Sequence, residues 1–225
     1  MLVQSPSVEK SISVRVQYMR AKRVMDLVIS LLLLPFLLLV IAIIALLIRL
    51  DSPGPIFFRQ KRIGQHGVEF DFFKFRSMYV NNDDTHHRTA IQRFMQGQTI
   101  DSNPGNAAPY KIKGDPRVTR VGRFIRKTSL DELPQYFNVL RGEMSLVGPR
   151  PPVPYEYEHY SAHDKLRLSG KPGLTGIWQV YGRSRVTFSE MVEMDITYLR
   201  QQSLRQDLKL ILLTIPVMLY GRGGA

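Results

Sequence analysis

Two adjacent carboxylates, Asp131 and Glu132, are the residues of this chain best suited to chemistry. Nearby positive charge favours the ionised form of an acid, and arginines precede this pair at every third position. We therefore expect both acids to be charged and able to act as a nucleophile toward an anionic substrate or as metal ligands. The arginines of the run are Arg117, Arg120, Arg123 and Arg126.

The same stretch also fits a purely structural interpretation. Ser129-x-x-Glu132 matches a helix capping box, and acids in the first turn of a helix are stabilised by the macrodipole. Pro134 favours a helix that begins nearby, because proline is tolerated only in the first turn. The two interpretations are compatible, since a carboxylate at a helix N-terminus can both cap the helix and attack a substrate.

Composition limits the class of protein. The chain has 225 residues, enough for one domain or for one domain with an appendage. It carries 31 Lys and Arg against 19 Asp and Glu, a net charge of +12 that suggests nucleic acid, anionic lipid or a phosphorylated substrate as partner. Cysteine is absent, which excludes a disulfide framework and a thiolate metal site.

The run from Leu27 to Ile48 contains no charged residue. As a straight helix it would reach about 33 Å, enough to cross a hydrocarbon core of about 30 Å. Pro35 inside the run and basic residues on both flanks argue instead for a segment that dips into one leaflet and returns. Both topologies stay open. The flanking residues are Arg20, Lys22 and Arg23 before the run, and Arg49, Arg59, Lys61 and Arg62 after it.

We predict an α+β fold, mainly helical, in three parts. Residues 1–21 form a polar segment, residues 22–50 a membrane-inserted helix broken at Pro35, and residues 51–225 a cytoplasmic catalytic domain. Aromatic segments at 56–60 and 70–75 predict a β-hairpin. Helices are expected at 136–140, 155–169, 189–199 and 204–220, the last lying on the membrane surface. Residues 171–183 alternate turn residues with β-formers and predict a tight loop or hairpin.

Two basic residues outside the arginine run could bind an anion. Lys74 lies among phenylalanines, where it is either an exposed edge residue or a phosphate ligand above an apolar floor. Arg150 lies between Pro149 and Pro151, which restrict its backbone and could direct its side chain at an anion.

Seven motifs, in this order, resemble the bacterial sugar transferase family, the monotopic polyprenyl-phosphate phosphoglycosyl transferases. The resemblance covers about Lys22 to Tyr220. The motifs are Asp26-Leu27, Leu50-Asp-Ser-Pro-Gly-Pro-Ile-Phe-Phe-Arg-Gln60, Phe73-Lys-Phe-Arg-Ser-Met78, Asp115-Pro-Arg-Val-Thr-Arg-Val-Gly122, Ser129-Leu-Asp-Glu-Leu-Pro-Gln135, Met144-Ser-Leu-Val-Gly-Pro-Arg-Pro151 and Pro172-Gly-Leu-Thr-Gly176.

The resemblance implies transfer of a sugar-1-phosphate from a nucleotide diphosphate sugar, expected to be a UDP-sugar, to undecaprenyl phosphate. It implies that Asp131 attacks the sugar-proximal phosphate to form a phosphosugar-enzyme intermediate, while Glu132 assists. The two acids would hold Mg²⁺ or Mn²⁺. The residues expected to bind substrate phosphate are Lys74, Arg117, Arg126 and Arg150, and those expected to contact nucleotide or sugar are Thr175, Gln179 and Arg183.

One motif of the family is altered. Its members carry a Ser-Pro pair at the bend of the re-entrant helix, which would fall near Leu38-Leu39. Here the proline is Pro35, preceded by Leu34, and the nearest hydroxyl is Ser30. The chain otherwise resembles a minimal form of the family, without additional N-terminal membrane helices.

The expected partners are the nucleotide sugar, undecaprenyl phosphate and the membrane, with no nucleic acid; a homo-oligomer is compatible with the sequence. The expected location is the cytoplasmic face of the bacterial inner membrane, at the first membrane step of polysaccharide or glycoconjugate assembly. No residue selects among galactose, glucose and N-acetyl sugars. The alternative is a membrane-tethered basic binding or scaffold protein without catalysis.

Overall fold

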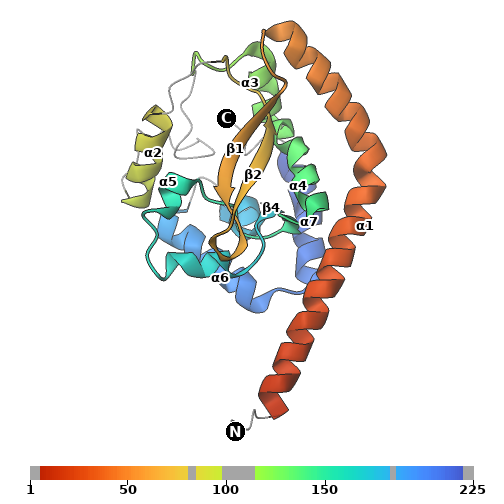
Figure 1. Ribbon diagram of the computed structural model, residues 1–225, viewed down its shortest axis with the longest axis vertical. Helices are drawn as coiled ribbons and strands as arrows, with labels where there is room; N and C mark the ends of the chain where they lie inside the picture. Colours follow the sequence, from red (N-terminus) through yellow and green to blue (C-terminus); the bar gives the residue numbers. More distant parts are fainter. Residues whose placement is uncertain (1–5, 81–84, 98–114, 183–185, 220–225) are drawn as a thin grey trace.

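The computed structural model describes residues 6–80, 85–97, 115–182 and 186–219. One long helix runs along one side of a smaller body made of short helices and two small sheets (Figure 1). The predicted class, α+β and mainly helical with a long apolar N-terminal helix and a β-hairpin, is confirmed.

The helices are α1 (Pro6–Asp51), α2 (Thr85–Met95), α3 (Arg120–Lys127), α4 (Tyr136–Arg141), α5 (Pro154–Tyr157), α6 (Phe188–Gln201) and α7 (Leu204–Leu219). The strands are β1 (Phe57–Ile63), β2 (Glu69–Phe75), β3 (Ser145–Val147) and β4 (Gly173–Thr175). Shorter turns are η1 (Gln65–Gly67), η2 (Leu130–Gln135), η3 (Asp164–Ser169) and η4 (Trp178–Gly182).

Helix α1 is longer than the apolar run that predicted it. It contains 46 residues, which corresponds to a length of about 69 Å, and residues 6–21 belong to the same helix. The break predicted at Pro35 is not present: the helix continues through this residue, and its axis is curved (Figure 1). Proline removes one backbone hydrogen bond, and a helix can absorb that loss by bending instead of ending.

The second half of α1 has two faces with opposite surroundings. Leu37, Ile41, Ile44 and Ile48 recur every three or four residues and are buried against Phe75, Ile125 and Leu133 of the body. The opposite face is apolar but uncovered, with Leu32 at 75% and Phe36 at 66% exposure. By length and composition, α1 could cross a membrane between Arg15 and Asp51.

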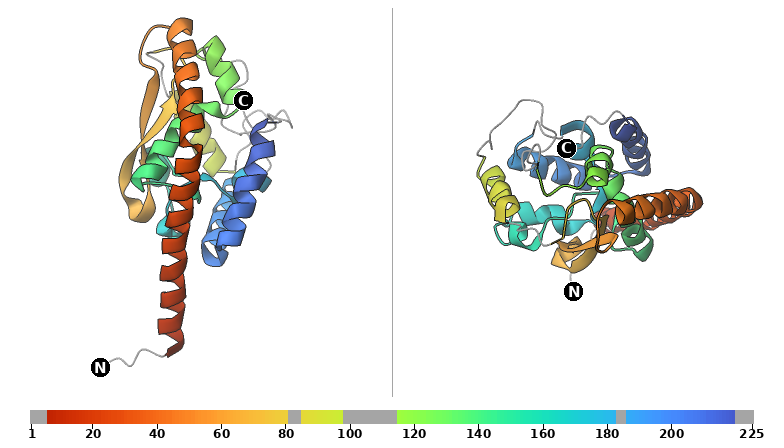
Figure 2. Two further views of the ribbon diagram at one scale, coloured as in Figure 1. Left: turned by 90° about the vertical axis from the view of Figure 1, so that its right-hand side faces the viewer. Right: turned by 90° about the horizontal axis from the view of Figure 1, so that it is seen from above.

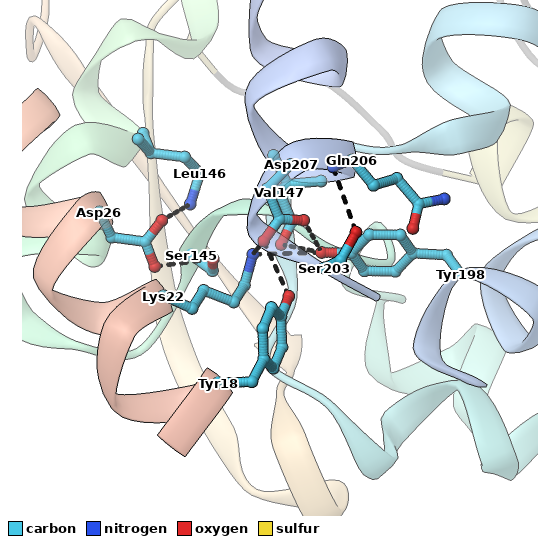
Figure 3. Close-up of polar contacts among 10 residues, drawn as sticks. All are labelled: Tyr18, Lys22, Asp26, Ser145, Leu146, Val147, Tyr198, Ser203, Gln206 and Asp207. Carbon is cyan, nitrogen blue, oxygen red and sulfur yellow. Dashed lines mark hydrogen bonds and ion pairs between the residues drawn. The ribbon is translucent and has the colours of Figure 1, made fainter. Parts of the chain in front are cut away.

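The first half of α1 is held to the body by buried polar groups (Figure 3). Lys22 Nζ lies 2.8 Å from Asp207 Oδ2 on α7, and the side chains of this pair are 7% and 0% exposed. The hydroxyls of Tyr18 and Tyr198 donate to the same carboxylate at 2.8 and 2.6 Å. Because an isolated buried charge is costly, these three donors together make the burial of Asp207 possible.

One turn further along α1, Asp26 makes a second buried connection. Its carboxylate accepts hydrogen bonds from Ser145 Oγ at 2.8 Å and from the backbone N–H of Leu146 at 3.1 Å (Figure 3). Both partners belong to β3, so α1 fixes the strand that leads into the proline-rich loop.

Strands β1 and β2 form the predicted antiparallel hairpin, in a register that places Lys74 opposite Phe58. The hairpin lies at one edge of the molecule (Figure 2). Phe70 and Phe72 of β2 enter the central core with Val139, Met144 and Tyr198. The inward aromatic residues therefore fix which face of the hairpin is buried.

The segment 171–183 differs from the loop or hairpin predicted for it. β4 pairs in parallel with β3, from a distant part of the chain, and a π-helical turn, η4, follows. The parallel pairing depends on close backbone approach: a Cβ at Gly173 would lie 2.0 Å from the backbone nitrogen of Gly148. A local pattern of β-formers cannot reveal a partner so far away in sequence.

The predicted helices have mixed outcomes. The predictions for 189–199 and 204–220 are confirmed by α6 and α7, and α4 ends as expected before Gly142, which adopts a left-handed conformation. The single helix predicted at 155–169 is wrong, because α5 and η3 are separated by a turn in which Asp164 accepts from the backbone N–H of Ser161.

Candidate active site

The acidic pair lies on η2, a 3₁₀ helix that packs against strand β2. Ser129, just before η2, has a left-handed backbone (φ 57°) and its side chain makes no cap hydrogen bond. The capping-box interpretation is therefore wrong. A non-glycine residue in this conformation is uncommon, and such strain is found preferentially at functional sites.

The Glu132 carboxylate bonds to a distant lysine instead of capping a helix. Lys74 Nζ on β2 lies 2.9 Å from Glu132 Oε1, with 18% and 26% of the two side chains exposed. Lys74 also lies over the ring of Phe72, 5.4 Å from its centroid. Of the two interpretations of Lys74, the structure supports an inward-facing cation above an apolar floor.

Arg150 reaches the same carboxylate from a third direction. Its Nη1 lies 3.6 Å from Glu132 Oε1, and its side chain is 23% exposed. Strand β2, η2 and the loop after β3 thus bring Lys74, Glu132 and Arg150 together. Asp131 precedes Glu132 in the first turn of η2 and is partly buried. The arrangement combines two acids with two cations at the molecular surface, where an anionic substrate can arrive.

The arginines of the α3 region have other surroundings. Arg117 forms a bidentate pair with Asp115, with Nη2 to Oδ2 at 2.7 Å and Nε to Oδ1 at 2.9 Å. Hydrogen bonding from Arg117 lowers the pKa of the Asp115 carboxyl, although burial opposes it. Arg126 is partly buried in the last turn of α3. The phosphate-binding roles expected for Arg117 and Arg126 stay predictions.

The residues expected to contact nucleotide or sugar are placed as follows. Thr175 Oγ1 is 2.7 Å from Thr214 Oγ1, so its hydroxyl connects β4 to α7. Gln179 Nε2 donates to the carbonyl of Leu174 at 3.3 Å. Arg183 lies outside the described residues. Their contact with substrate stays a prediction.

Comparison with known proteins decides the family. The sequence profile described as "Bacterial sugar transferase" matches residues 17–221 of the chain. The chain belongs to the bacterial sugar transferase family. The resemblance carried by the seven motifs is therefore confirmed, and Asp131, Glu132, Lys74 and Arg150 all lie within the matched region.

Named relatives of this sugar transferase include proteins of two lengths. It is 47% identical over 177 residues to the galactosyl transferase CpsE of Streptococcus agalactiae, covering 78% of the chain and 37% of that protein. It is 43% identical over 166 residues to the undecaprenyl-phosphate galactose phosphotransferase of Salmonella typhimurium, covering 74% and 34%. The exopolysaccharide production protein ExoY of Sinorhizobium fredii is 40% identical over 207 residues, covering 90% and 87%. The chain thus spans about two fifths of the galactosyl transferase but most of ExoY.

A magnesium ion at the acidic pair stays a prediction, and substrate phosphates would complete its ligands. Among the described residues, no group of three or more His, Asp or Glu side chains could hold a metal. Mg²⁺ commonly binds one or two carboxylates while substrate phosphates supply further ligands. Asp131 and Glu132 offer that donor set, and Lys74 already occupies one oxygen of Glu132.

Sequence reasoning missed three buried charged residues beside the site. Arg62 lies on β1, Arg167 on η3 and Asp195 on α6, and all are less than a tenth exposed. Arg167 forms a buried ion pair with Asp195. No local pattern distinguishes these residues from surface charges, since their burial depends on contacts between distant elements.

Proposed function

We propose that this protein transfers a sugar-1-phosphate from a UDP-sugar to undecaprenyl phosphate, through a phosphosugar intermediate on Asp131. Membership of the family, together with the clustering of Lys74 and Arg150 on Glu132 next to Asp131, is the observation that carries the proposal. Relatives named for undecaprenyl-phosphate galactose or glucose phosphotransfer support the class of reaction.

In the first step a carboxylate oxygen of Asp131 attacks the sugar-proximal phosphorus. A bond forms from Asp131 to phosphorus, the diphosphate bridge breaks, and UMP leaves with the bridging oxygen. Phosphoryl transfer depends mainly on positioning and on neutralising the phosphate charge. Lys74 and Arg150 would neutralise this charge. Both cations would exchange the Glu132 carboxylate for phosphate oxygens, so that each keeps an anionic partner.

In the second step a phosphate oxygen of undecaprenyl phosphate attacks the same phosphorus. The bond to Asp131 breaks, the carboxylate is restored, and a lipid-linked diphosphate sugar leaves. In the first step, Asp131 and Glu132 would hold a magnesium ion, which would supply charge neutralisation to the diphosphate as UMP leaves. Before the substrate binds, Lys74 orients Glu132 through the 2.9 Å contact.

The proposed location is the cytoplasmic face of the inner membrane, with the uncovered face of the curved helix α1 dipping into one leaflet. Both ends of its apolar run contact the same body: Lys22 bonds to Asp207 near one end, and Asp51 Oδ2 accepts the backbone N–H of Val121 near the other. A helix that crossed the bilayer would separate these two ends. The uncovered face around Leu32 and Phe36 is the part that would enter lipid.

The reaction can be tested with purified protein, magnesium and undecaprenyl phosphate, by measuring UMP release from a panel of UDP-sugars. We expect lipid-dependent release with at least one sugar, and loss of release in Asp131→Asn. Asp71→Asn is the matched control, because this acid pairs only with the exposed cations Arg59 and Lys61 among the contacts described. Substantial turnover by a folded Asp131→Asn variant would contradict the role of Asp131. Silence of wild-type protein across the panel would favour the scaffold alternative.

The topology has its own test. Single cysteines at Ser7 and at His66 should both be shielded from a membrane-impermeant thiol reagent added outside intact cells, and both should react after lysis. The chain contains no cysteine, so each label reports one site. Labelling of only one site in intact cells would establish a spanning helix.

A further inference from the structure

The backbone carbonyls of the loop that carries Arg150 have unusual hydrogen-bond donors. Pro149, Pro151 and Pro152 lack N–H groups, and the extended loop belongs to no sheet, so its carbonyls need partners from elsewhere. The outer two are bonded by backbone groups: Gly173 N donates to Pro149 O at 2.9 Å, and Ile63 N donates to Pro152 O at 2.9 Å. The two carbonyls between them, those of Arg150 and Pro151, are bonded by arginine side chains.

Arg62 holds the carbonyl of Pro151. Its Nη1 donates to this oxygen at 3.0 Å, and only 6% of the residue is exposed. The guanidinium is itself fixed, since Nη2 donates to Gln60 Oε1 at 3.1 Å and the group lies 5.2 Å from the centroid of the Phe72 ring. Phe72 is also the ring that Lys74 contacts, so both cations lie over the same aromatic side chain.

Arg167 holds the carbonyl of Arg150. Its Nη2 donates to this oxygen at 3.4 Å, and only 1% of the residue is exposed. Asp195 balances the charge of Arg167 in a buried ion pair. Arg167 Nη1 donates to the hydroxyl of Tyr160 at 2.8 Å. A buried ion pair costs desolvation energy and is weak evidence for stability, which favours a role for the Arg167–Asp195 pair in fixing the loop.

Three consecutive carbonyls are therefore held: that of Pro149, before Arg150, by Gly173 N, that of Arg150 by Arg167, and that of Pro151 by Arg62. Fixing the peptide groups before and after Arg150, and the one that follows, fixes the direction in which its side chain leaves the backbone, toward Glu132. Arg62, Arg150 and Arg167 also line one small cavity of about 40 Å³, together with Glu156.

We propose that Arg62 and Arg167 are positioning residues for sugar-phosphate transfer, holding the Arg150 backbone so that its guanidinium meets the substrate phosphate beside Asp131. This inference rests on the proposed function. A displacement of about 1 Å at a reacting group can cost roughly 100-fold in rate. Loss of either donor should therefore lower kcat by about 10- to 100-fold while changing the KM for UDP-sugar less.

The test is a double-mutant cycle with Arg150→Gln, using radiolabelled UDP-sugar so that slow variants are measurable. Arg62→Met removes one donor. Arg167→Met is combined with Asp195→Leu, because the double change removes both members of the closest buried pair. Glu156, 4.0 Å from Arg167 Nη1, keeps the hydroxyl of Tyr160 as a donor. Arg59→Met, on the exposed side of the same strand, is the matched control and should retain wild-type kcat. Arg62→Lys keeps a charge and a donor, and should recover most of the loss. Thermal unfolding of each variant distinguishes loss of the fold from displacement of the Arg150 side chain in a folded protein.

If both arginines act through Arg150, their substitutions should cost about 10- to 100-fold in the wild-type background but less than about twofold once Arg150 is glutamine. Equal losses in the two backgrounds, or wild-type kcat in folded Arg62→Met and in the Arg167→Met, Asp195→Leu variant, would overturn the inference. An inactive wild-type protein would overturn the proposed function as well, whereas additive losses in an active protein would overturn this inference alone.

Discussion

Replacing Lys22 by methionine tests whether the buried pair with Asp207 holds the first half of α1 to the body. After the substitution Asp207 keeps the hydroxyls of Tyr18 and Tyr198 as donors but loses its only cation among the contacts described. Removing one partner of a buried ion pair costs about 3–5 kcal/mol. Because two donors remain, we expect Lys22→Met to lower the unfolding free energy by about 3 kcal/mol.

Replacing both members of the Lys22–Asp207 pair tests the coupling more sharply. Asp207→Leu leaves the ammonium of Lys22 with the hydroxyl of Tyr198, at 3.1 Å, and should cost about 4 kcal/mol. If the two sites were independent, the double variant would lose about 7 kcal/mol. We expect it to lose only about 3 kcal/mol, because no buried charge is left without a partner.

The assay is denaturant unfolding in detergent micelles, followed by fluorescence of Trp178, the single tryptophan of the chain. Lys209→Met, on the exposed side of α7, is the control and should stay within about 0.5 kcal/mol of wild type. Additive losses in the double variant would refute the coupling between α1 and α7, and with it one of the two contacts that support a common side for both ends of the apolar run.

Three further predictions follow from single contacts. Lys74→Met should lower kcat/KM for UMP release by about 100- to 1,000-fold. Lys74→Arg should be less impaired because it keeps the positive charge. Equal losses in the two variants would contradict a role for that charge. Asp115→Asn should lower the unfolding free energy by about 1–3 kcal/mol at pH 7. Since the folded-state pKa of Asp115 is below its ordinary value of 3.8, its ionised form stabilises the fold above that pH. The difference from wild type should shrink as the pH falls through the folded-state pKa, and a difference that grows in acid would contradict this. Gly122→Ala would place a Cβ 2.0 Å from the carbonyl oxygen of Ser77 and should cost more than about 2 kcal/mol, measured by thermal unfolding.

The sequence predicted elements whose pattern is local. The alternation of phenylalanines around Lys74 predicted the hairpin, and the apolar periodicity after Leu204 predicted α7. The long uncharged run predicted the apolar helix, though not its extension back to Pro6. The family motifs predicted that Asp131, Glu132, Lys74 and Arg150 share one site. In the structure three of them, Lys74, Glu132 and Arg150, are in contact.

Features that depend on distant partners were not predictable in this way. The capping box at Ser129 failed because Lys74, far away in sequence, takes the Glu132 carboxylate that a cap would need. Lys22 has the same local surroundings as the flanking cations of any membrane helix, and only the fold shows that it is buried against Asp207. The pairing of β3 with β4 and the arginines beneath the Arg150 loop are likewise properties of tertiary contact.

A covalent phosphosugar at Asp131 is the central step of the proposed reaction, and one measurement tests it directly. Wild-type protein mixed with its UDP-sugar and magnesium, without lipid acceptor, should release about one UMP per protein molecule and gain the mass of one sugar phosphate. Asp131→Asn should do neither, and adding undecaprenyl phosphate should remove the added mass. A wild-type protein that turns over with lipid present, yet shows neither the UMP burst nor the mass gain without it, would contradict the intermediate.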